Sequence, residues 1–288
     1  MSNLKQLRTR IKSVKSTQKI TKAMQLVSAS KMTKIKTQIA NSNFYIEAIN
    51  KMMSDICSMT SCELSIEEQK FFNTMPSKIN LLIVMTSERG LCGMFNYSII
   101  KQVKNDIKEL TNKGEQIKLI IIGKKGYEAL KRQYANYINS YFEFTKIHSE
   151  NLILQVKEKI MCAVKNLEVS NCIIYFNKFK NAMTQIPTKQ KILPIEKHQD
   201  YSVVANDYFE YEGKNLISNL INLYVHAKIN YALLQNIVSE EGARMTAMEN
   251  ATNNANDLIS KLVLKLNRSR QTIITTELIE IIAGAEAV

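Results

Sequence analysis

The first seventy-five residues contain neither glycine nor proline, the two residues that most readily interrupt a helix. Pro76 is the first proline and Gly90 the first glycine. Residues spaced alternately by three and four form a seam that is apolar at both ends and polar from 18 to 28. This pattern predicts a coiled-coil helix of about 55 residues, roughly 80 Å long. The seam consists of Leu4, Leu7, Ile11, Val14, Gln18, Thr21, Gln25, Ser28, Met32, Ile35, Ile39, Ser42, Ile46, Ile49, Met53 and Ile56.

A second helical pattern, at the other end of the chain, supplies the partner that a long seam requires. Between Lys214 and Ala283 there is no proline and only one glycine, Gly242. Apolar residues again step by three and four, which predicts that the two arms pair antiparallel. Two separate amphipathic helices packed on a globular core are the alternative. The apolar positions include Leu216, Leu220, Leu223, Leu234, Ile237, Met245, Met248, Ala255, Leu258, Leu262, Leu266 and Ile273.

The centre of the chain alternates short apolar runs with helical stretches. Strands are expected at 79–86, 118–122, 137–144 and 171–179, and helices at 97–112 and 150–167. Residues 185–195 contain two prolines, which suits an edge strand. The alternation predicts a mostly parallel sheet covered by helices, a Rossmann-like α/β domain inserted into a long antiparallel coiled coil. The expected domains are an N-terminal coiled-coil helix (1–75), an α/β domain (76–212) and a C-terminal coiled-coil helix (213–288).

Basic residues dominate the N-terminal arm. The net charge is +13, and ten lysines and arginines precede the first acidic residue, Glu47. Such a segment needs an acidic partner, which nucleic acid, anionic lipid or an acidic protein surface can provide. A nucleic-acid-binding protein usually adds aromatic side chains, whereas the first aromatic residue here is Phe44. A solvated coiled-coil face and an acidic protein partner are therefore preferred, and a basic scaffold that binds nucleic acid or anionic membrane is the alternative.

Other classes of protein are excluded by what the sequence lacks. No uncharged apolar run approaches the ~18–20 residues of a transmembrane helix. The first residues have no apolar core followed by a small-residue cleavage site, so no secretory signal is expected. Five cysteines without a CxxC pair and three scattered histidines form no zinc pattern. We expect free thiols in a reducing compartment, with no metal and no cofactor.

Two glycine-containing loops are the candidates for chemistry. Gly123-Lys-Lys-Gly126 follows a strand, where backbone N–H groups can bind phosphate, but it lacks the G-x-x-x-x-G-K-[ST] pattern. Gly90-Leu-Cys92-Gly93 carries a thiol, yet the histidines at 148, 198 and 226 lie far away in the sequence and no motif supplies a base. The preferred interpretations are a strand-to-helix turn and a tight loop whose glycines accept positive φ. No catalytic residue is predicted.

Long, specific motifs occur at both ends and in the middle of the chain. They are Ile11–Met24 (IKSVKSTQKITKAM), Val27–Met32 (VSASKM), Ser87–Gly93 (SERGLCG), Ser239–Met248 (SEEGARMTAM), Ala251–Ala255 (ATNNA) and Asn267–Ile281 (NRSRQTIITTELIEI). Together they resemble the gamma subunit of F-type ATP synthases over essentially the whole chain. Three positions depart from the family pattern: Glu88 replaces the usual Asp, Met94 stands where a third glycine is common, and Gly242 occupies a position that is usually Ala.

The resemblance implies a central-stalk rotor that couples proton-driven rotation of a ring of c subunits to ATP synthesis or hydrolysis in a hexamer of alpha and beta subunits. It implies a non-catalytic subunit, present in one copy, that also binds the epsilon subunit. Such a protein is expected at the cytoplasmic face of a bacterial inner membrane, as a peripheral protein.

The resemblance also implies two groups of contact residues. Positions near the interface between rotor and beta subunits are Lys19, Lys22, Met24, Arg270, Gln271, Thr275 and Glu277. Positions at the junction with the c ring and epsilon are Tyr208, Tyr211 and Glu212.

Overall fold

The computed structural model describes residues 2–59, 66–72, 79–144, 149–166, 169–195 and 216–286. Its elements follow the chain in alternating order between two long terminal helices. They are α1 (Ser2–Met59), α2 (Ile66–Phe72), β1 (Ile79–Met85), α3 (Phe95–Asn112), β2 (Gln116–Ile122), α4 (Lys124–Tyr134), the 3-10 helix η1 (Ala135–Tyr137), β3 (Ile138–Phe142), α5 (Ser149–Lys165), β4 (Asn171–Phe179), β5 (Gln185–Leu193) and α6 (Leu216–Glu286).

The five strands form one sheet in the order β3-β2-β1-β4-β5. The first four strands run parallel, and β5 pairs antiparallel with β4 at one edge. Because β1 lies in the centre and is covered on both faces, its residues 80–85 are all buried, as the apolar run from Leu81 to Met85 requires. The predicted fold class is confirmed, including the edge position of the proline-containing strand.

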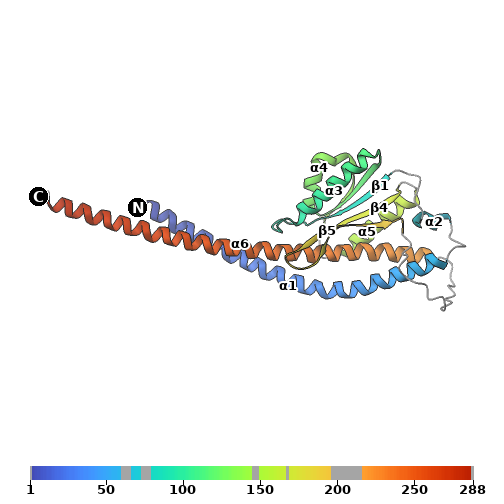
Figure 1. Ribbon diagram of the computed structural model, residues 1–288, viewed down its shortest axis with the longest axis horizontal. Coiled ribbons are helices and arrows are strands. Elements are labelled where there is room, and N and C mark those ends of the chain that lie inside the picture. The colour runs from blue at the N-terminus through green and yellow to red at the C-terminus, as the bar shows by residue number, and fades with distance from the viewer. Residues whose placement is uncertain are drawn as a thin grey trace. The chain divides into compact units, whose positions relative to one another are not determined.

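Helices cover both faces of this sheet (Figure 1). On one face α3 and α4 pack on Leu82, Val84 and Ile121 in one apolar cluster. On the other face α5, the second half of α1 and the first half of α6 pack on residues such as Ile83 and Ile174. The alternation of side chains along β1 therefore divides the core into two layers.

The chain forms two compact units. One contains Met1–Ala29 and Arg244–Val288, and the other contains Ser30–Ala243. The sheet and its helices belong to the second unit, together with the adjoining parts of both long helices. The first unit consists of helical residues from α1 and α6 alone and is called the shaft below.

The two helices of the shaft pair antiparallel along the predicted seam. Gln18 Nε2 donates a hydrogen bond to Asn256 Oδ1, and the hydroxyls of Thr21 and Thr252 share one of 2.8 Å. Residue numbers thus fall on α6 as they rise on α1. On α1 the buried shaft residues Leu7, Thr21 and Ser28 all lie on the predicted seam, and on α6 the buried shaft residues are Arg244, Met248, Thr252, Ala255 and Leu262.

The polar break in the seam is occupied by these interhelical contacts. Thr21 and Ser28 are buried, whereas the apolar side chains of Ile20 and Val27 beside them are 57% and 52% exposed. Burial therefore follows the heptad position and not the hydrophobicity of the residue. Two predicted apolar positions on α6 differ: Leu223 is 48% exposed, and Leu258 is exposed beside the half-buried Ile259.

The short helix α2 was not predicted. It has only seven residues, too few to display a helical period, and α1 ends at Met59 before it. Phe71 of α2 is buried in the cluster that α5 and α6 share. Its carbonyl accepts a 2.8 Å hydrogen bond from the Ile195 N–H, which fixes α2 beside the end of β5.

The paired threonines allow a direct test of the shaft register. We expect Thr21→Val and Thr252→Val each to lower the free energy of unfolding by about 1 kcal/mol, since each removes a buried hydrogen bond. The double variant should be less destabilised than the sum, with a coupling energy of about 1 kcal/mol in a double-mutant cycle. Urea unfolding of the full chain measures this. Additive losses would show that the two hydroxyls do not interact.

Candidate functional site

The carboxyl edge of the parallel strands carries the two glycine loops, and Thr86 lies at their centre. Its hydroxyl donates to the carbonyls of Ile122 and Gly123, at 3.1 and 3.2 Å, and accepts a 2.9 Å bond from the Gly126 N–H. A Cβ at Gly123 would lie 2.3 Å from the Thr86 carbonyl oxygen, and one at Gly126 would lie 2.6 Å from Thr86 Oγ1. Both glycines are therefore required by close packing against Thr86.

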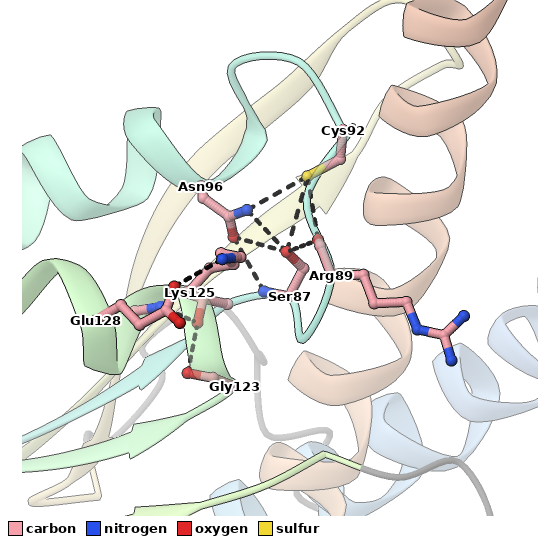
Figure 2. Close-up of polar contacts among 9 residues, drawn as sticks. Ser87, Arg89, Cys92, Asn96, Gly123, Lys125 and Glu128 are labelled. Carbon is pink, nitrogen blue, oxygen red and sulfur yellow. Dashed lines mark hydrogen bonds and ion pairs between the residues drawn. The ribbon is translucent and has the colours of Figure 1, made fainter. Parts of the chain in front are cut away.

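Donors at the start of α4 are already used within the protein. The N–H groups of Gly123 and Lys125 donate to the carbonyls of Phe142 and Ser87, at 3.0 and 3.1 Å. The Lys125 ammonium pairs with Glu128 Oε2 at 2.6 Å, a bond that lowers the pKa of that carboxyl (Figure 2). A phosphate loop leaves such groups open for its ligand. The strand-to-helix turn, which the sequence favoured, is what the structure has.

The loop after β1 is a second closed network. Figure 2 shows the Asn96 side chain directed at Ser87 and Cys92. Asn96 Nδ2 donates to Ser87 Oγ at 2.7 Å and to Cys92 Sγ at 3.3 Å, while Asn96 Oδ1 accepts from the Ser87 N–H at 3.0 Å. The Ser87 hydroxyl also donates to the Arg89 carbonyl at 2.7 Å. Asn96 thus ties the first turn of α3 to the loop that precedes it.

The Cys92 thiol does not have the environment of a nucleophile. It is 2% exposed, so a substrate cannot reach it. The Ser87 hydroxyl, the Asn96 amide and the Arg89 carbonyl, which its sulfur contacts, do not take up a proton at neutral pH. Burial raises the pKa of the Cys172 thiol to about 12, which makes that residue inert as well.

Backbone conformation in this loop differs in one detail from the prediction. Gly93 adopts φ +57°, as expected, but the second left-handed residue is Leu91 at φ +64° and not Gly90. Glu88, which replaces the Asp usual in the family, accepts a 2.5 Å hydrogen bond from the Phe144 N–H. This bond joins the loop after β1 to the chain that follows β3.

The described part of the chain shows neither a metal cluster nor a membrane-spanning helix. Among the residues that the structure describes, no cluster of three or more His, Cys, Asp or Glu side chains could hold a metal ion. None of the described helices has a segment long and apolar enough to span a bilayer.

The predicted contact residues on α1 lie in the middle of the shaft. Lys19 and Lys22 are exposed and Met24 is half-buried. The Lys22 ammonium donates to Gln25 Oε1 at 3.2 Å, one turn further along the same helix. Neither lysine occupies the seam, so both charges are available to a partner.

The predicted contact residues on α6 lie at a different level of the shaft. Continuing the Thr21–Thr252 register sets Arg270 and Gln271 beside the first residues of α1, roughly 24 Å along the helix from the level of Lys19. Thr275 and Glu277 come after that level, where residues 274–283 are all exposed. The structure therefore separates the seven shaft residues into two groups. Tyr208, Tyr211 and Glu212 lie outside the described residues.

Comparison with known proteins identifies the family. A family profile described as ATP synthase matches residues 3–288. The chain is 92% identical to the ATP synthase gamma chain of Rickettsia typhi and 85% identical to that of Rickettsia felis, in both cases over the full length of both chains. The chain belongs to the ATP synthase gamma chain family. These relatives give no support to a scaffold that binds nucleic acid or membrane.

Solved structures of ATP synthases have the same fold as this gamma-chain family member. The central stalk and c-ring structure of the Tetrahymena thermophila mitochondrial ATP synthase contains a chain with a TM-score of 0.61 and 26% identity, covering 81% of this chain and 99% of that one. A chain in the Euglena gracilis mitochondrial ATP synthase has a TM-score of 0.69 at 18% identity, covering 99% and 94%. The second likeness concerns the fold alone.

Two sets of structurally important residues were missed from the sequence. The partners of Gln18 and Thr21 could not be named, because heptads give a seam and not the pairing across it. Asn177 was predicted as part of a strand and given no role of its own. Its side chain is fully buried, which is unusual for Asn, and an Asn within an apolar strand is the sequence signal that could have drawn attention to it.

The close packing of Gly123 gives a second prediction. Gly123→Ala should lower the free energy of unfolding by about 3 kcal/mol or more, because it combines a positive φ with a backbone collision. Gly114→Ala is the matched control: φ is +72° there, but a Cβ would meet no atom within 4 Å. We expect it to cost only about 1 kcal/mol. Equal losses in urea unfolding would contradict the collision.

Proposed function

We propose that this gamma-chain family member is the central-stalk rotor of an F-type ATP synthase. The observation that carries the proposal is the antiparallel shaft, whose longer helix runs without interruption from the sheet-containing unit to beyond the start of α1. A single continuous helix that reaches both units can carry a rotation from one to the other. The 92% identity with a bacterial gamma chain supports the same conclusion.

The partners follow from this role. The shaft turns inside a hexamer of alpha and beta subunits, and the basic residues of α1 face acidic protein surfaces there. The segment around Tyr208, Tyr211 and Glu212 meets the c ring and the epsilon subunit. One copy is present in each complex, which lies at the cytoplasmic face of the bacterial membrane as a peripheral assembly.

The mechanism requires no catalytic group in this chain. A rotor shifts the equilibrium between states of a catalytic site only by contacting those states with different free energies. The shaft is asymmetric, because its two helices differ in sequence and α6 extends past the N-terminal end of α1. Each orientation of the shaft therefore presents different side chains to the surrounding subunits. ATP is made or hydrolysed by the partner subunits, and the chain itself is non-catalytic.

Arg270 and Gln271 provide a test of torque transmission. Both are exposed, so the Arg270→Ala, Gln271→Ala variant should assemble normally with an unchanged melting temperature. Coupled ATP synthesis by the assembled complex should fall, because contacts with the beta subunits are lost. Lys265→Ala, an exposed change on the same helix, is the control and should retain synthesis. Wild-type synthesis by the double variant would remove both residues from the interface.

The contact with the c ring is tested by cross-linking. Cysteine introduced at Tyr208 or Tyr211 should be captured by a c subunit in the membrane-bound complex. The same substitution at Met183, which is 82% exposed on the turn between β4 and β5, is the control. Products that contain only alpha or beta subunits would contradict this placement.

A further inference from the structure

Strand β4 continues beyond the strand that pairs with it. The last parallel pair joins Val84 of β1 to Tyr175 of β4, and β1 ends one residue later, at Met85. β4 continues to Phe179. None of the described strands lies beside its last residues on that side, and buried backbone groups need hydrogen-bond partners.

Side chains of α6 take the place of the missing strand. The N–H groups of Asn177 and Phe179 donate to Asn236 Oδ1 at 3.2 Å and to Gln235 Oε1 at 3.1 Å. Ser239 Oγ donates to the Asn177 carbonyl at 2.8 Å. Gln235, Asn236 and Ser239 are 5%, 3% and 0% exposed, so water does not compete for these bonds. We call these three side chains and Asn177 the polar clamp.

The Asn177 side chain extends the clamp to α3. Its Nδ2 donates to the Phe95 carbonyl at 3.2 Å, and its Oδ1 accepts from Ser98 Oγ at 3.5 Å. On the opposite strand Asn177 faces Pro187, which has no N–H to offer. No bond is lost there, since both backbone groups of Asn177 are bonded to α6. One fully buried residue thus joins the sheet, α3 and α6.

This clamp occupies the place where doubly wound folds bind ligands. β1 lies between strands reached by crossovers in opposite directions, so the carboxyl ends of β1 and β4 form the switch point of the sheet. Here α6 supplies the polar groups that meet those ends, together with a small apolar cluster of Cys92, Phe95 and Ala243. α6 therefore occupies the position at the switch point where a ligand binds in other doubly wound sheets.

We propose that the polar clamp fixes the rotational position of α6 about its own axis relative to the sheet, so that torque passes between the α/β unit and the shaft without slip. This inference rests on the rotor function proposed above. Apolar packing, which holds α6 along residues 221–237, is non-directional and tolerates small rotations. Hydrogen bonds lose strength steeply when their angles change, so they resist such rotation.

The position of the clamp along α6 suits this role. Ser239 lies one turn before Ala243, the last residue of α6 that belongs to the sheet-containing unit. A rotation of the helix at this level would be carried into every later turn. The clamp residues are positioning residues, and they take no part in the chemistry of ATP.

The test compares two double variants in the assembled complex. Asn236→Leu with Ser239→Ala removes two clamp bonds. Asn222→Leu with Ser260→Ala is the control, because those side chains bond to the Ser218 and Asn256 carbonyls within α6 itself, at 2.9 and 3.1 Å. Hydrogen exchange at the Asn177 amide should become at least about fivefold faster in the clamp variant and stay unchanged in the control.

Proton pumping per ATP hydrolysed is the functional measurement. This ratio should fall about twofold or more in assembled complexes of the clamp variant, because local opening of the contact between α6 and β4 competes with the transmission of torque. Asn236→Asp, which keeps the acceptor for Asn177, should recover the ratio. If the clamp had a purely structural role, the clamp variant would give fewer complexes, but those that assemble would pump as many protons per ATP as the wild type. That result would overturn the proposal.

If the clamp variant does not assemble, Ser239→Ala alone is compared with Ser260→Ala by the same two measurements. Absence of ATP-driven pumping with the wild-type chain would instead contradict the rotor function.

Discussion

The structure depends on one helix that buries different faces along its length. α6 has 71 residues, and most of the stability of a helix in a protein comes from the packing of its apolar face and not from helix propensity alone. Residues 221–237 pack in the core beneath the sheet, and from Met248 onward the buried positions form a seam against α1. Each unit therefore stabilises its own section of α6, and the continuity of the helix links the two.

The edge of the sheet explains how a doubly wound domain can serve a purpose other than binding a small molecule. Thr86 fills the space above Gly123 and Gly126, and Asn96 closes the loop that contains Cys92. α6 then satisfies the open end of β4. Groups that hold a nucleotide in related sheets are here bonded to other parts of the same chain. The outer surfaces of the helices are accessible, which suits a subunit that acts through contacts with other proteins.

Most of the fold could be predicted because its elements have strong periods. β4 was predicted with the bounds that the structure has, and α3, β2 and α5 within two residues at each end. α2 could not be predicted because seven residues contain no repeat, and its position depends on Phe71 entering a core built by other elements. The left-handed Leu91 was not predicted, since glycine is the residue that most readily adopts a positive φ and the same loop contains Gly90 and Gly93.

The sequence by itself determined the two long helices, the alternating α/β centre and the family, because periodicity and extended motifs are written in neighbouring residues. Only the tertiary structure decided the meaning of the polar residues. Thr21 interrupts an apolar seam when read along the chain, but it meets Thr252, 231 residues away, and so becomes part of the helix pairing. Asn177 is a polar residue that interrupts an apolar strand, yet residues of α6 and α3 provide it with hydrogen-bond partners. A buried polar group stabilises or destabilises according to whether a partner reaches it, and that partner is supplied by the fold and not by the local sequence.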